Sequence, residues 1–271
     1  MKKIVEMYCE LPQTVRKPLW RVWHNLLIKF DKNASEVFMN YGYASKNGEF
    51  SHLQLKNEDM QHRYFIQLYD FVTRNHKFEN TRVLEVGSGR GGGASFLSRY
   101  KNPTEYIAMD ISQKIIDFCN GYYKIPNLKF IKGEAEKIPF GESEFDALVN
   151  VESARCYGSI QTFFNEVYRV LKPGGKFLFA DMIKKEDVGA IMEMLAATGF
   201  IMHDKVDIRE NVVMALQLNS EQNKKVIAEN VPKFLRSSFN EFAGVEGTNR
   251  YNSFYSSEMN YYSFTLEKPV K

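Results

Sequence analysis

Short apolar runs alternate with helical patterns through the middle of the 271-residue chain. The runs that predict strands lie at 81–86, 105–110, 128–133, 145–150 and 176–181. Apolar residues at three- and four-residue spacing separate most of them, as at 112–123 and 159–171. Strands that alternate with helices predict a doubly wound, mostly parallel sheet with helices on both faces. We therefore expect a Rossmann-like α/β core over residues 81–182.

Residues 1–80, which precede this core, carry helical patterns. One lies at 19–30, and a second follows Asn57, where two acidic residues occupy the first turn of the expected helix. Between them, the Gly and Asn content of 38–50 predicts a loop. We expect residues 1–80 to form a helical cap or lid over the core.

Residues 183–271, which follow the core, combine both kinds of pattern. A strand is predicted at 200–208, helices across 209–241, and an edge or antiparallel strand at 260–268. We expect this region to complete the core sheet and to supply a helical insertion that forms a substrate pocket.

Charge and composition argue against several classes of protein. The net charge is +3 and no run of five basic residues occurs, which disfavours nucleic acid as a partner. Three cysteines stand far apart, so we expect neither a disulfide framework nor a metal site. No secretory signal and no apolar stretch of membrane-spanning length is present, which predicts a cytoplasmic protein without an integral membrane segment.

A glycine cluster follows the first predicted strand and opens a helix. Gly87, Gly89 and Gly92 satisfy the pattern G-x-G-x-x-G, in which glycines permit a tight turn and a close approach of backbone to ligand. Asp110, which ends the second predicted strand, is placed to accept hydrogen bonds from ribose hydroxyls. The pattern indicates an adenosine-containing cofactor but is shared with NAD enzymes.

Three further features favour one cofactor. Glu85 stands two residues before the first glycine, and acids and a Pro-Phe turn follow the third strand within 133–150. LKPGGKF at 171–177 predicts the stop of a helix, a tight turn and the start of a strand. In this order and spacing they resemble the motif series of class I S-adenosylmethionine-dependent methyltransferases. An NAD-dependent dehydrogenase is thereby disfavoured.

The resemblance implies a role for individual residues. Asp110 would hold the ribose hydroxyls, Ile111 would pack on the adenine, and Glu134, where the superfamily usually has Asp, would meet the adenine edge. The full set of cofactor-binding residues that it implies is Tyr41, Arg63, Glu85, Gly87, Ser88, Gly89, Asp110, Ile111, Glu134, Ala135 and Asn150. Tyr41 and Tyr43 are interpreted as part of a lid, with Tyr43 on the substrate side; plain packing of cap on core is the alternative.

The similarity extends beyond the core. WRVWHNLLIKF (20–30), EVFMNYGYA (36–44), FDALVNVESARCY (145–157) and MNYYSFTLEK (259–268) resemble one family. It contains the mycobacterial phthiotriolone and phenolphthiotriolone dimycocerosate methyltransferases and related fatty-acid and glycopeptidolipid O-methyltransferases. The resemblance implies methyl transfer from S-adenosyl-L-methionine to a hydroxyl or carboxyl of a lipid-like or polyketide-like small molecule, with S-adenosyl-L-homocysteine as product.

One departure from the family pattern matters for the chemistry. Where the family reads V-E-x-S-H-C-Y, this chain has Arg155 in place of the histidine. Arginine stays protonated and cannot act as an ordinary base. Glu152, Tyr157 and Asp181 are therefore the candidate catalytic residues, although Glu152 could instead be a structural acid paired with Arg155. Arg155 could bind an anionic acceptor or lie in solvent.

The loss of the histidine also leaves other functions open. A neutral amine or an enolised carbon needs less help with its proton, so N- or C-methylation of a small natural-product precursor is one alternative. A catalytically silent protein that keeps the cofactor fold is another. The oligomeric state and the identity of the acceptor are not indicated by the sequence.

Overall fold

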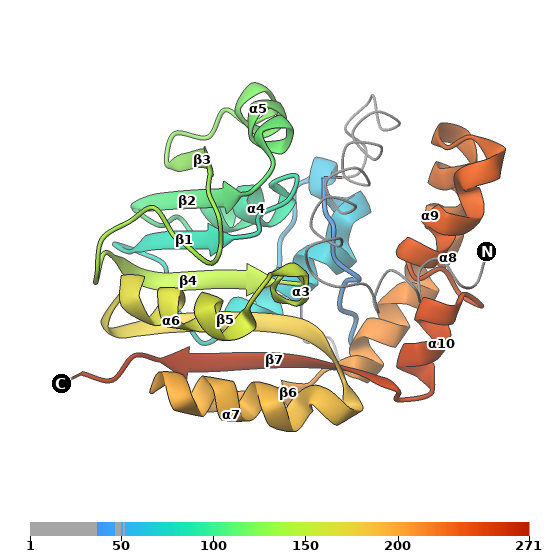
Figure 1. Cartoon of the computed structure of the whole chain (residues 1–271). Helices are drawn as coiled ribbons and strands as arrows, with labels where there is room; N and C mark the ends of the chain where they lie inside the picture. Colours follow the sequence, from blue (N-terminus) through green and yellow to red (C-terminus); the bar gives the residue numbers. More distant parts are fainter. Residues whose placement is uncertain (1–36, 47–49, 51, 271) are drawn as a thin grey trace.

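The computed structural model describes residues 37–46, 50 and 52–270, so the helix predicted at 19–30 lies outside the described residues. Within them, seven strands form one sheet in the order β3-β2-β1-β4-β5-β7-β6 (Figure 1). The strands are β1 (Arg82–Val86), β2 (Glu105–Asp110), β3 (Leu128–Lys132), β4 (Phe145–Val151), β5 (Leu171–Lys184), β6 (Ile201–Asp207) and β7 (Met259–Glu267).

The helices that accompany the sheet fall largely where the sequence predicts them. The α-helices are α3 (Arg63–Thr73), α4 (Gly92–Tyr100), α5 (Gln113–Tyr122), α6 (Ile160–Val170), α7 (Val188–Thr198), α8 (Arg209–Asn230), α9 (Arg236–Phe242) and α10 (Asn249–Tyr255). Short 3-10 helices are η1 (Asn57–His62), η2 (Ala154–Cys156), η3 (Lys185–Asp187) and η4 (Lys233–Leu235). The helix predicted to begin at Asn57 thus begins as the 3-10 helix η1 and becomes α-helical at Arg63.

Strands β1 to β5 are parallel, which confirms the predicted doubly wound α/β sheet. β7 pairs antiparallel with β5 and also with β6, so the run at 260–268 is an antiparallel strand inside the sheet. The edge strand next to β7 is β6, in which no residue is fully buried. In β7, by contrast, Tyr261 and Phe264 are wholly buried and belong to the cores on opposite faces.

Alternation along the strands divides the apolar residues between two cores. Val83 of β1 packs with α3, α4 and α5 on one face, whereas its neighbour Leu84 packs with α6 and α7 on the other. Phe177 and Leu178 of β5 divide in the same way. Successive strand side chains point to opposite faces, so a sheet covered on both sides needs such continuous apolar runs.

The start of β5 differs from the predicted turn. The segment 171–177 was expected to stop a helix, turn tightly and then begin a strand. Instead, Leu171 already pairs with Phe145 of β4, and the register shifts between Phe145 and Ala147. Gly174, at a φ of 79°, donates its N–H to Lys268 beyond β7. Gly174 and Gly175 therefore lie within a strand that is already paired, and both form backbone hydrogen bonds with Lys268.

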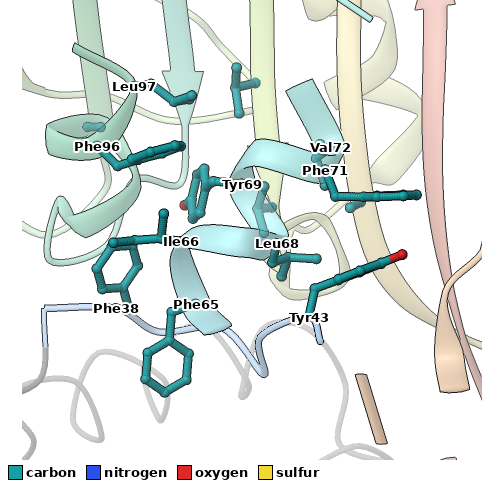
Figure 2. Packing of buried hydrophobic residues seen from close by; sticks show 14 of the residues in the cluster. Phe38, Tyr43, Phe65, Ile66, Leu68, Tyr69, Phe71, Val72, Phe96 and Leu97 are labelled. Atoms are coloured by element: carbon teal, nitrogen blue, oxygen red, sulfur yellow. The ribbon is translucent and has the colours of Figure 1, made fainter. Parts of the chain in front are cut away.

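Helix α3 carries the described part of the predicted cap onto the core. Figure 2 shows Ile66 and Tyr69 of α3 beside Phe96 of α4, with Phe38 close to both. The rings of Phe38 and Phe65 stack with their centroids 6.0 Å apart. Residues 37–44, here called the strap, belong to no helix or strand, as predicted for the loop. The strap bonds to α4 through Gly92 N–H and Val37 O, 3.1 Å apart.

The carboxyl ends of the parallel strands meet the helices of the last region. In Figure 1 the arrowheads of β1, β2 and β4 point to the side on which α8, α9 and α10 lie. Ligands of open α/β sheets bind at this end, where the strand order reverses. Here the reversal falls between β1 and β4.

Candidate active site

The loop between β1 and α4 depends on its glycines. Gly87, Gly89 and Gly91 all have positive φ, at 77°, 50° and 80°. A Cβ on Gly87 would lie 2.3 Å from Ser153 Oγ, closer than real side chains approach. Only glycine therefore lets this backbone turn at the end of β1 while the segment after β4 packs against it.

Asp110 lies at the end of β2, directly across from this loop. Its Oδ2 accepts the Gly89 N–H at 3.1 Å and its Oδ1 accepts the Ser112 N–H at 2.9 Å. Burial raises the pKa of the carboxyl, and these backbone N–H groups oppose that rise. The acid is thus fixed by the loops on either side and stays available to a ligand in the cavity that it lines.

A first cavity opens at the carboxyl ends of β1, β2 and β4. It is lined chiefly by residues 37–40, 86–89, 109–112 and 133–136 and by Val151, Glu152, Ser153, Arg155, Cys156 and Tyr157. The structure thereby brings together seven of the predicted cofactor residues: Gly87, Ser88, Gly89, Asp110, Ile111, Glu134 and Ala135. The buried Oγ of Ser88 finds no hydrogen-bond partner among the described residues.

Glu85 and Asn150 lie behind this cavity and are not among its lining residues. Both are fully buried. Glu85 accepts hydrogen bonds from the hydroxyls of Tyr69 and Tyr106 at 2.8 and 2.9 Å. Asn150 donates its Nδ2 to Val86 O at 2.8 Å and so joins β4 to the end of β1. Glu85 and Asn150 therefore lie where they can support the glycine loop from the side away from the cavity.

Three other predicted residues lie away from the first cavity. Arg63 is exposed, with its guanidinium over the ring of Tyr64. Tyr41 is buried and lines a second cavity. Tyr43 lines neither cavity, because its ring stacks on Phe71 with centroids 4.5 Å apart. For Tyr43, the alternative of plain packing between cap and core describes the observed position.

Glu152 follows β4 and faces both cavities. Its Oε1 accepts the Tyr41 N–H of the strap at 2.7 Å and the Tyr261 hydroxyl of β7 at 2.9 Å. Its Oε2 lies 3.8 Å from Arg155 Nη2. Burial raises the pKa of Glu152 to about 7, although Arg155 and the Tyr41 N–H lower it. The backbone of Glu152 is left-handed, with φ at 55°, an uncommon conformation for a side chain of this size.

Arg155 is held between two acids. Its Nη1 lies 2.7 Å from Asp181 Oδ1 and donates to Glu152 O at 2.6 Å. Burial lowers the pKa of the guanidinium, but Asp181 and other neighbours outweigh that effect and keep it well above its ordinary value. The Arg155 guanidinium therefore stays positively charged and faces both cavities, with its Nη1 already bonded to Asp181 and to the Glu152 carbonyl. Asp181 itself lies behind Arg155 and lines neither cavity.

Tyr157 lines the first cavity and forms part of a small hydroxyl cluster. Its hydroxyl lies 2.7 Å from Ser153 Oγ and accepts from Asn150 Nδ2 at 3.0 Å. Burial raises the pKa of Tyr157, so the phenol stays neutral over the physiological range. A neutral phenol can orient a ligand but is a poor acceptor of protons.

The second cavity adjoins the first beneath α8 and α9. Its lining is mainly apolar and includes Phe38, Phe65, Leu216, Val226, Ile227, Val231, Phe239 and Phe242. Both cavities share Glu152 and Arg155, together with the strap residues Phe38, Met39 and Asn40. The sequence predicts that the helical insertion forms a wall of the substrate pocket. It does not identify these individual residues, since an apolar helix face equally indicates a buried core.

The sequence argues against membrane-spanning helices and against a metal site. None of the helices in the described part of the chain has the length and apolar character that crossing a bilayer requires. In the same residues, no three His, Cys, Asp or Glu side chains gather as metal ligands would.

Comparison with known proteins agrees with this geometry. A family model described as a methyltransferase domain matches residues 84–179. A phthiotriol/phenolphthiotriol dimycocerosates methyltransferase of Mycobacterium tuberculosis is 34% identical, with 93% of each chain covered. The chain belongs to this methyltransferase family. It is an S-adenosylmethionine-dependent methyltransferase, and the NAD, N- or C-methylation and silent-protein alternatives are not favoured.

A second relative and a solved structure are also similar to this chain. A fatty-acid O-methyltransferase of Mycolicibacterium smegmatis is 37% identical over 76% of this chain and 74% of the relative. The crystal structure of the [4+2]-cyclase SpnF superposes with a TM-score of 0.72 at 19% identity, covering 96% of this chain and 97% of that one. At that identity the second match shows the shared fold only.

Glu85 should make the stability of this methyltransferase depend on pH. Burial raises the pKa of Glu85 from its ordinary 4.5 to about 7. Between these values the folded protein keeps a proton that the unfolded chain has lost, so the free energy of unfolding falls as the pH rises. The variant Glu85→Gln lacks this titration. Urea unfolding should show that the wild type loses roughly 3 kcal/mol relative to the variant across this window.

The matched control is Glu79→Gln, an exposed acid close to β1. This variant keeps Glu85, so its free energy of unfolding should fall with pH across the same window as that of the wild type. A difference between Glu85→Gln and the wild type that stays constant with pH would contradict the buried titration.

Proposed function

We propose that this methyltransferase methylates an oxygen, of a hydroxyl or a carboxyl, on a lipid-like small molecule. The observation that carries the proposal is the junction of the two cavities. One cavity has the polar groups and glycine loop that suit the cofactor, the other is mainly apolar, and Glu152 and Arg155 stand where they meet. The named relatives act on phthiotriol dimycocerosates and on fatty acids, which supports a lipid-like acceptor.

The first cavity fits S-adenosylmethionine in its donor and acceptor groups. Asp110 offers a fixed carboxylate to the ribose hydroxyls, and Ile111 offers an apolar face to the adenine. Glu134 and Ala135 lie where the adenine edge would be read. The Oγ of Ser88, which has no hydrogen-bond partner in the described part of the chain, suits the polar methionine end beside the glycine loop. When bound, the cofactor supplies a methyl group that its sulfonium already activates.

Glu85 and Asn150 would act on the cofactor through the loop that they support. The exposure of Arg63 and the place of Tyr41 in the second cavity favour a supporting role for these two residues as well. The proposed contacts therefore rest on the loop residues, on Asp110 and on the 133–136 segment.

The second cavity suits an apolar acceptor. Its walls come from α8, α9, α3 and the strap, and burying a hydrocarbon chain there is favoured by the hydrophobic effect. Nucleic acid is a poor fit, because such an acceptor would need a positively charged surface and the net charge is only +3.

Glu152 is the residue that we propose as general base for a hydroxyl acceptor. It lines both cavities, and its Oε2 is the oxygen not engaged by the strap and β7. Its pKa of about 7 lets it take a proton near neutral pH. Arg155 and Asp181 hold this carboxylate in place, and Arg155 also offers a cation to an anionic acceptor. Tyr157, whose hydroxyl stays neutral, would orient the ligand.

Replacing Asp110 should weaken the binding of the cofactor product. Asp110→Asn removes the anion that would accept from the ribose hydroxyls, so calorimetric titration with S-adenosylhomocysteine should show at least about a tenfold rise in Kd. Asp117→Asn, an exposed acid on α5, serves as control and should bind as the wild type does. Unchanged affinity in Asp110→Asn would refute the proposed ribose contact.

Replacing Glu152 should separate hydroxyl from carboxyl acceptors. Glu152→Gln keeps the size of the side chain but cannot take a proton, so kcat for a hydroxyl acceptor should fall about 10²- to 10⁴-fold. In the wild type, that rate should rise with pH through about 7, as Glu152 becomes ionised, and then level off. A carboxylate acceptor has no proton to lose, so its methylation should change little. A fully active variant on the hydroxyl acceptor would exclude Glu152 as the base.

The acceptor class is tested directly by incubation with S-adenosylmethionine and a panel of long-chain alcohols, long-chain carboxylic acids and long-chain amines. Mass spectrometry of the products should show methyl ethers or methyl esters. Methylation of the amines alone would overturn the proposed function.

A further inference from the structure

One wall of the mainly apolar second cavity carries amide side chains. From α8, Asn223 and Asn230 line the cavity together with Val226 and Ile227. These two asparagines are seven residues apart, so they lie about 20° from each other around the helix and about 10 Å apart along it. They therefore form part of one face of α8, directed into the same cavity.

The start of this face lies beside the reacting end of the cavity. Leu216 of α8 and the ring of Tyr41 both lie against Gly244, where an added Cβ would be 3.0 Å from Leu216 Cδ2 and 3.3 Å from Tyr41 Cε1. The N–H of Tyr41 is bonded to Glu152. Since Asn223 follows Leu216 by seven residues, it lies about 10 Å from Leu216 along the helix axis.

The side chains of Asn223 and Asn230 keep hydrogen-bonding groups that no other described residue engages. Asn230 donates its Nδ2 to Val226 O at 2.9 Å, which leaves its carbonyl oxygen available. The side chain of Asn223 makes no hydrogen bond with the described residues. A plain hydrocarbon tail would leave such groups unpaired at a cost in binding free energy.

We propose that Asn223 is a specificity-determining residue that hydrogen-bonds a second oxygen function on the acceptor tail. The acceptor is then a lipid that carries a hydroxyl, keto or ester oxygen at a distance from the methylated oxygen. This inference rests on the proposed function, because it takes the second cavity as the acceptor site. A site built to bond an oxygen discriminates against analogues that lack it.

The test measures binding separately from methyl transfer. The protein, saturated with S-adenosylhomocysteine, is titrated with stearyl alcohol and with derivatives in which one added hydroxyl is moved stepwise along the chain. The wild type should bind the best-placed diol about tenfold more tightly than stearyl alcohol. Asn223→Leu, which keeps the branched shape and the number of side-chain heavy atoms but has no amide, should lose that preference and keep its affinity for stearyl alcohol.

Gln222→Leu is the matched control, because Gln222 is exposed on the next position of the same helix. It should keep the preference for the diol. Equal binding of stearyl alcohol and every diol by the wild type would overturn the proposal, as would a preference that survives in Asn223→Leu. Failure of all these lipids to bind would also overturn it.

Incubation of the same lipids with S-adenosylmethionine keeps the two proposals apart. If the diol binds with the expected preference but gains no methyl group on oxygen, the role of Asn223 stands and O-methylation falls. If stearyl alcohol and the diols are methylated on oxygen with equal affinity, the proposed function stands and the role of Asn223 falls.

Discussion

The buried carboxylate of Glu152 ties the site of this methyltransferase together. Its Oε1 accepts hydrogen bonds from the Tyr41 N–H of the strap and from the Tyr261 hydroxyl of β7. Its Oε2 faces Arg155, which forms an ion pair with Asp181 of β5. A buried acid without such partners would be strongly destabilising, so each element is held where it can supply one. The boundary between the two cavities is set by the same contacts.

Most of the fold was predictable because local pattern and overall architecture agree. Parallel strands covered on both faces require continuous apolar runs, and these runs mark β1 to β5 with errors of a few residues, apart from the longer β5. The position of β7 was less predictable. Its period-two pattern suits an edge as well as an interior strand, and only the burial of Tyr261 and Phe264 on opposite faces distinguishes the two.

The site divides in a similar way. Asp110 at the end of β2 and Gly89 on the turn after β1 both line the first cavity, where sequence analysis expected them, because a strand end and a short turn leave little freedom. Residues whose position depends on distant partners were not placed. Glu85 lies behind the cavity because tyrosines from α3 and β2 converge on it, and Tyr43 is turned away by Phe71. No spacing along the chain encodes such convergence.

Glu85 and Glu152 show why geometry has to accompany a shifted pKa. Both acids are buried, and burial raises the pKa of each to about 7. In Glu85 each oxygen accepts a tyrosine hydroxyl, and neither cavity reaches it, so its proton affects stability alone. In Glu152 one oxygen takes both structural hydrogen bonds, which leaves the other beside Arg155 at the cavity junction. Chemistry requires a proton acceptor that a substrate can touch, and of these two acids only Glu152 meets that requirement.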